Sequence, residues 1–146
     1  MLSLMNAADR EAVTDRLHRL TPDAPNKWGR MTAHEAVCHM SDQLRVGLGD
    51  LTTSGQPGLV TRTLGKWIVL HLPLPIPRGR IETVPEMQTA RPATWGADLA
   101  ACTELIRRVG GGQASGTHPA FGPTTPAEWG VLAYKHLDHH LQQFGV

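Results

Sequence analysis

Apolar residues recur every three or four positions along most of the chain, a spacing that places them on one face of a helix. In the first such stretch, about residues 6–20, the apolar positions are Ala8, Val13, Leu17 and Leu20. Pro22 and Pro25 follow, and proline interrupts a helix because it lacks a backbone N–H. The pattern therefore predicts an amphipathic helix that ends near Leu20.

Two further helices have clear start signals. Thr32 and Glu35 stand three residues apart, and so do Thr125 and Glu128. This is the spacing of a capping box, in which the threonine hydroxyl accepts a hydrogen bond from the glutamate amide while the glutamate carboxylate accepts one from the threonine amide. The helices expected from these signals cover about 32–49 and 125–144.

The middle of the chain is harder to interpret. Residues 59–72 are mostly apolar and long enough for a helix, although a strand is the alternative for their β-branched end. Residues 73–92 contain five prolines and predict an irregular connection, with one short run of alternating apolar and polar residues at 81–84. A connection of this length tends to be functional or to wrap a surface. Another amphipathic helix is expected over about 95–109.

These elements define the expected fold class. With five helices at most and no convincing alternating strand, the class is all-α. The 146 residues fit a single domain that covers residues 1–146. Four main helices and a long proline-rich connection favour a four-helix bundle.

Composition narrows the function. The chain has 14 basic and 13 acidic residues, a balance that gives no electrostatic footprint for nucleic acid or an anionic membrane. No apolar stretch approaches the length of a membrane span, and Asp9 and Arg10 interrupt the place where a secretion signal would be apolar. With only Cys38 and Cys102, we expect a cytoplasmic protein with reduced thiols. A nucleophilic Cys38 is the less favoured alternative.

The last predicted helix contains a cluster of histidines. His136 and His140 are four residues apart, so in a helix they lie about 40° apart around the axis, on the face that carries Trp129 and Leu137. A buried polar group without a partner costs roughly 1–3 kcal/mol, and imidazole is a common metal ligand. The pair therefore indicates a metal site, although such pairs also arise by chance in long helices.

A metal ion needs at least a third ligand. His39 is the best candidate, because it lies in the second predicted helix at the edge of the apolar stripe. His34 points to the opposite side of that helix, and we expect it to be solvated. His118 precedes the last helix in a loop, so it is a candidate to overhang the site and contact a substrate.

Three segments resemble a known family. Residues 28–42 read WGRMTAHEAVCHMSD, residues 118–130 read HPAFGPTTPAEWG and residues 136–143 read HLDHHLQQ. The first and third resemble the W-G-x-M…H-x-x-D and H-x-x-H-H-x-x-Q patterns of the DinB-like (DinB/YfiT) metal-binding four-helix bundles. The second is typical of an uncharacterised branch of that superfamily, and the resemblance covers about residues 9–146.

The resemblance implies a divalent metal ion, zinc or nickel, held by His39, His136 and His140. Relatives with known activity are metal-dependent transferases and isomerases that use low-molecular-weight thiols, and some relatives are hydrolases. We therefore expect a small-molecule substrate, with a low-molecular-weight thiol as one candidate, and no nucleic acid or membrane partner. No catalytic residue is assigned by the motifs. A non-catalytic bundle with a structural ion or none, acting through a homodimer or another partner, stays open as the alternative.

Overall fold

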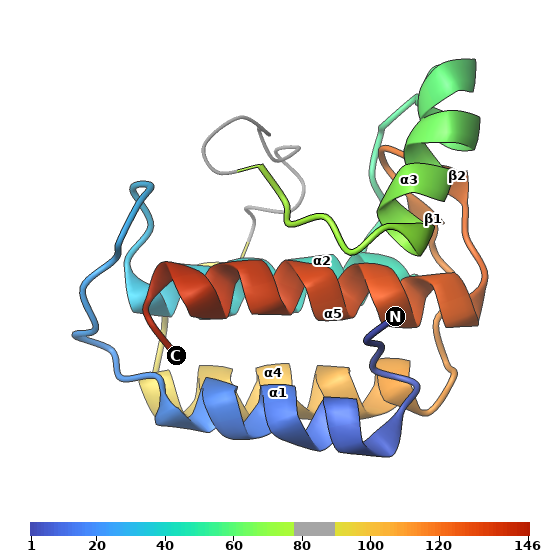
Figure 1. Ribbon diagram of the computed structural model, residues 1–146. Helices are drawn as coiled ribbons and strands as arrows, with labels where there is room; N and C mark the ends of the chain where they lie inside the picture. The colour runs from blue at the N-terminus through green and yellow to red at the C-terminus, as the bar shows by residue number, and fades with distance from the viewer. Residues whose placement is uncertain (78–89) are drawn as a thin grey trace.

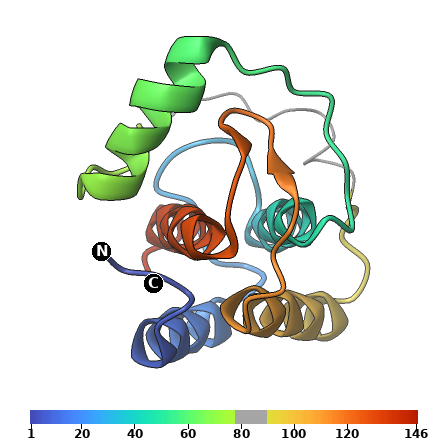
Figure 2. The same ribbon diagram turned by 90° about the vertical axis from the view of Figure 1, so that its right-hand side faces the viewer.

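Four long helices make up most of the fold. The computed structural model describes residues 1–77 and 90–146. The long helices are α1 (Ala7–Arg19), α2 (Ala33–Leu48), α4 (Trp95–Gly110) and α5 (Pro126–Gln143). α2 and α5 form one layer and α1 and α4 the other, and α1 and α2 each contact both α4 and α5 (Figures 1 and 2). The described chain is mostly helical, as the sequence pattern predicts.

Both predicted capping boxes are present. The Thr32 hydroxyl accepts from the Glu35 amide at 3.2 Å, and the Glu35 carboxylate accepts from the Thr32 amide at 2.8 Å. Thr125 and Glu128 make the same two contacts at 3.3 and 2.8 Å. At the other end of α2, Gly49 has a φ of 78°, the left-handed conformation that favours glycine at the end of a helix. Local signals therefore set where α2 begins and ends and where α5 begins.

The third predicted helix forms with an irregular first half. A π-helical turn, η1 (Thr61–Gly65), runs directly into α3 (Lys66–His71). The helix interpretation of residues 59–72 is therefore confirmed over its strand alternative. This helix lies outside the two layers, over α5 (Figure 2). Four of its large apolar side chains are exposed: Leu59, Val60, Leu64 and Trp67.

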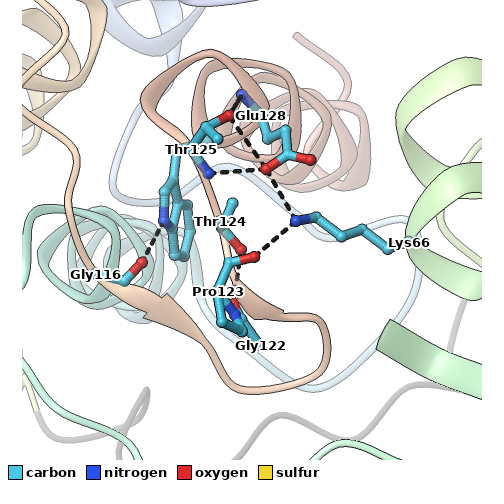
Figure 3. A network of polar contacts seen from close by, with 8 residues as sticks. Lys66, Gly116, Gly122, Pro123, Thr124, Thr125 and Glu128 are labelled. Atoms are coloured by element: carbon cyan, nitrogen blue, oxygen red, sulfur yellow. Dashed lines mark hydrogen bonds and ion pairs between the residues drawn. The ribbon is translucent and has the colours of Figure 1, made fainter. Parts of the chain in front are cut away.

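Polar contacts hold α3 on the outer face of α5. The ammonium group of Lys135 donates to the carbonyls of Val69 at 2.6 Å and Leu72 at 2.7 Å. At the opposite end, Lys66 donates to the carboxylate of Glu128 at 2.9 Å (Figure 3). Polar side chains on this face of α5 thus bind a neighbouring element.

A short hairpin corrects the expectation of a loop before α5. β1 (Thr117–His118) pairs antiparallel with β2 (Gly122–Pro123). Strands of two residues are too short to produce an alternating pattern in the sequence. The indole N–H of Trp129 donates to the Gly116 carbonyl at 2.8 Å (Figure 3), and a side chain at Gly116 would collide with the carbonyl of Val46. The hairpin region is therefore held closely between α2 and the start of α5.

One apolar core lies between the two layers. The predicted inner face of α5 is buried in it: Trp129, Leu132, Ala133, Leu137 and Phe144. Cys38 and Cys102 are buried and not linked by a disulfide. Among the described residues, no helix combines the length and apolar character needed to cross a bilayer. Of the predicted irregular connection, residues 78–89, including the run at 81–84, lie outside the described residues.

Candidate metal centre

Three imidazoles meet between α2 and α5. His39 comes from α2, and His136 and His140 come from successive turns of α5. The ring centroids of His39 and His136 are 4.7 Å apart, those of His39 and His140 are 4.8 Å apart, and those of His136 and His140 are 4.6 Å apart. His39 is 3% exposed and His140 is 8% exposed, while His136 is partly buried. The fold brings together the three residues that the sequence predicts as ligands.

Nitrogen atoms of the three rings converge. The Nε2 atoms of His39 and His136 are 3.0 Å apart, and one nitrogen of each ring lies within 4.8 Å of the others. Two imidazoles bound to one zinc ion, with Zn–N distances of about 2.0–2.1 Å, would place their nitrogens about 3.3 Å apart in tetrahedral geometry. The observed spacing is close to this value, so small side-chain shifts would allow one ion to contact all three rings.

Gln143 orients the His140 ring. Its amide nitrogen donates to the Trp28 carbonyl at 2.6 Å, so its amide oxygen is free to accept from Nδ1 of His140 at 2.9 Å. Nδ1 of His140 therefore carries the proton and Nε2 keeps its lone pair. Gly29, next to Trp28, has a φ of 79°, and a Cβ there would lie 2.6 Å from the Gln143 side chain. Glycine at this position lets the loop approach Gln143.

Burial keeps the rings of His136 and His140 neutral. Desolvation, with the nearby His39, lowers the pKa of His140 to about 3. Desolvation and the neighbouring histidines, His140 first among them, also lower the pKa of His136 well below its usual value. At neutral pH these imidazoles are therefore uncharged, which is the form that binds metals.

A cavity of about 330 Å³ reaches the centre from the α2 side. Its lining is formed by Arg30, Met31, Glu35, His39, Ala90, Arg91 and Pro92. The buried carboxylate of Asp42, one turn after His39, accepts from the Ala90 amide at 2.9 Å and so holds this part of the chain against α2. The cavity therefore borders the three-histidine cluster at His39, which is itself almost fully buried.

His34 corrects the expectation of a solvated side chain. Its Nε2 lies 2.7 Å from the Asp98 carboxylate of α4, and its ring packs edge-on against Trp95 with centroids 5.4 Å apart. His34 is partly buried because α4 packs against this side of α2. The helical wheel gives the correct direction of the side chain but does not reveal the neighbouring helix.

His118 lies in the hairpin, away from the cavity beside His39. Its ring stacks on Phe121 with centroids 4.6 Å apart and lies 5.1 Å from the Trp129 ring. Its Nδ1 accepts from the Ala120 amide at 3.1 Å. Burial and the nearby Lys66 lower the pKa of His118 to about 4. A role for His118 in substrate binding stays a prediction.

Arg30 and Arg91 were not identified as site residues by sequence reasoning. Nothing in the sequence marks them, because their approach to His39 depends on how the segments around α2 fold back. Gln143 belongs to the final motif, but its role in orienting His140 becomes visible only with the contact to Trp28.

The fold and the site together define a mostly helical protein with a buried cluster of three histidines. Comparison with models of protein families, with curated proteins and with solved structures gives no match. The resemblance to DinB-like proteins therefore rests on the three motif segments and on no other comparison.

Proposed function

We propose that this protein is a DinB-like bundle that binds one divalent metal ion through His39, His136 and His140 and uses it in small-molecule chemistry of the thiol-transfer or hydrolytic type. The observation that carries the proposal is the convergence of three buried ring nitrogens, two of them 3.0 Å apart. The packing of four long helices around one core supports the same family.

The number of N–H groups on the three imidazoles favours a bound cation between them. Each neutral imidazole has one N–H, and His140 uses its N–H on Gln143. The contact between the Nε2 atoms of His39 and His136 requires only one proton. Nε2 of His140 and the accepting Nε2 of the His39–His136 contact therefore carry lone pairs. A metal ion would bind both and would replace the proton shared by His39 and His136.

The ligand set favours an open site. Structural zinc sites normally have four protein ligands, whereas catalytic sites have three and leave a position for water or substrate. Neither cysteine belongs to the three-histidine cluster, and a cavity lies directly beside His39. Zinc and nickel both suit imidazole ligands. A divalent ion in such a site lowers the pKa of a bound water or thiol and provides a nucleophile near neutral pH.

A non-catalytic role is the second candidate. The exposed apolar side chains of the segment 59–67 favour association with another protein surface, including a second copy of this chain. In that case a variant with Leu64 and Trp67 replaced by serine should change the mass measured by sedimentation, and an unchanged mass would argue against it.

Elemental analysis of protein purified without a metal-binding tag tests the main proposal. We expect about one zinc or nickel ion per chain in the wild type and almost none in His140→Ala. His34→Ala is the matched control, because it removes a histidine from the same region but not from the cluster, and it should keep its metal. Circular dichroism establishes that each variant is folded, and Gln143→Leu serves as a milder second variant. Unchanged metal content in His140→Ala would exclude the proposed centre.

A further inference from the structure

The cavity beside His39 is lined by two arginines from distant parts of the sequence. Arg30 precedes α2, and Arg91 follows the segment outside the described residues. Both line the same cavity of about 330 Å³ as the His39 ring. Two guanidinium groups therefore border the space through which a small molecule would reach the three-histidine cluster.

Neither guanidinium makes a hydrogen bond or an ion pair within 4.0 Å with any residue in the described part of the chain. The acidic residue in the lining is Glu35. Its carboxylate is already used in the capping box, where it accepts from the amide and hydroxyl of Thr32 at 2.8 and 3.1 Å. The hydrogen bonds from Thr32 lower the pKa of Glu35, and the charge of Arg91 adds a smaller effect. The donors of Arg30 and Arg91 thus remain available to a ligand.

Charge selects the ligand class. Two arginines and one glutamate line the cavity, so its side chains sum to 2 − 1 = +1. A carboxylate carries a single negative charge and matches the planar fork of a guanidinium, whereas a phosphate monoester carries about −1.5 to −2 at pH 7. The volume lies at the lower end of the range for ligand pockets, about 300–1,000 Å³, so the ligand is small.

We infer that the substrate is a small carboxylate, held by Arg30 and Arg91 while its reacting end lies at the three-histidine cluster. This inference rests on the proposed metal centre and adds the substrate class. Arg30 and Arg91 are substrate-binding residues in this view, and they contribute nothing to holding the ion.

The test uses the full chain loaded with Co²⁺, because a thiolate bound to Co²⁺ produces a charge-transfer absorption band. Two probes of similar size are titrated: 3-mercaptopropionate, which carries a carboxylate, and 1-thioglycerol, which is uncharged. The ratio of their dissociation constants is compared among the wild type, the double variant Arg30→Gln/Arg91→Gln, and Arg19→Gln. Arg19 is exposed on α1, away from the cavity, so its variant controls for the loss of positive charge.

We expect the preference for 3-mercaptopropionate to fall by about tenfold or more in the double variant, corresponding to about 1.4 kcal/mol. The affinity for 1-thioglycerol and the Co²⁺ stoichiometry should stay the same, and Arg19→Gln should behave as the wild type. If the double variant binds Co²⁺ and both probes with the wild-type ratio, the carboxylate inference is wrong while the metal centre stands. If the wild type binds no Co²⁺, the proposed centre and the inference fail together. If it binds Co²⁺ but shows no band with either thiol, the inference fails while the metal centre stands.

Discussion

Two histidines on α2, five residues apart, have opposite surroundings. His34 faces α4 and lies 2.7 Å from the Asp98 carboxylate. His39 faces α5 and meets only other imidazoles in its cluster, those of His136 and His140. The first histidine has a counter-charge in the fold, and the second belongs to a group of rings with no carboxylate among them.

This difference is the reason why we propose only one of the two clusters as a metal centre. The ligand atoms of His34, Cys38 and Asp98 also lie within 4.8 Å of one another. However, Asp98 already accepts from His34 and from the Ala93 amide at 2.9 Å, while burial and the charge of Asp98 raise the pKa of the Cys38 thiol. That cluster is complete as a helix-to-helix contact, whereas the cluster of His39 consists of imidazoles alone.

The largest difference between the clusters should appear when metal is added. A ligand that binds only the folded state at 1,000 times its dissociation constant stabilises it by about 4 kcal/mol. We expect zinc to raise the free energy of unfolding of metal-free wild type by about this amount, and to have no such effect on His140→Ala. Denaturant titration with and without zinc measures it. His34→Ala should still be stabilised, and equal stabilisation of His140→Ala would contradict the assignment.

Lowering the pH should have the next largest effect, and it should affect the buried histidines before the carboxyl of Asp98. The pKa is lowered to about 3 for His140 and to about 4 for His118, from 6.5. Between pH 6.5 and 4 the unfolded chain therefore binds protons that the folded chain does not. As the pH is lowered through this range, the free energy of unfolding decreases by about 1.4 kcal/mol per pH unit for each group. The carboxyl of Asp98, whose pKa is lowered by the Ala93 amide and His34, loses its stabilising effect only below about 3.8.

His118→Gln isolates one of these contributions. In metal-free protein, its loss of stability between pH 6.5 and 4.5 should be smaller than that of the wild type by about 2–3 kcal/mol. Urea unfolding at several pH values provides the measurement. Parallel curves for the two proteins would show that the folded-state pKa of His118 is not lowered.

Gln143→Leu should have an intermediate effect. Removing the acceptor of His140 frees the ring to rotate and to change its protonated nitrogen, and loss of such a hydrogen bond typically weakens metal binding by about 10–100-fold. Gln143→Glu keeps an acceptor for His140 and should retain more affinity than the leucine variant. Competition with a chromophoric chelator gives the dissociation constants. If Gln143→Leu and the wild type bind the metal with equal affinity, Gln143 does not orient His140 for metal binding.

Asp98→Asn should have the smallest effect on stability, and it should affect only the cluster of His34, Cys38 and Asp98. Replacing the charged partner of a partly exposed pair costs about 1 kcal/mol or less, so thermal unfolding should shift by a few degrees. Zinc affinity should equal that of the wild type. A large loss of zinc affinity would show that the two sides of α2 are not independent.

How much the sequence predicts depends on how local each feature is. The capping boxes at Thr32 and Thr125 involve residues three positions apart, so the starts of α2 and α5 are predicted well. The shared direction of His136 and His140 follows from helical periodicity alone. Selecting His39 as the third member required its place on the wheel together with the family motif.

The sequence does not predict features that depend on packing between distant segments. The contact of His34 with Asp98 spans 64 residues and exists because α4 lies against α2. The β1–β2 hairpin is too short to leave a pattern, and the π-helical turn at Thr61–Gly65 has no signal in composition. Arg30 and Arg91 are ordinary surface arginines in the sequence, and only the fold places them beside one cavity.

X-ray absorption at the zinc edge of the reconstituted protein identifies the atoms that bind the ion. We expect one zinc ion with three imidazole nitrogens at about 2.0–2.1 Å and an oxygen in the remaining position, and a lower imidazole count in His39→Ala. A spectrum with sulfur ligands, or with the same imidazole count in His39→Ala, would contradict the proposed three-histidine centre.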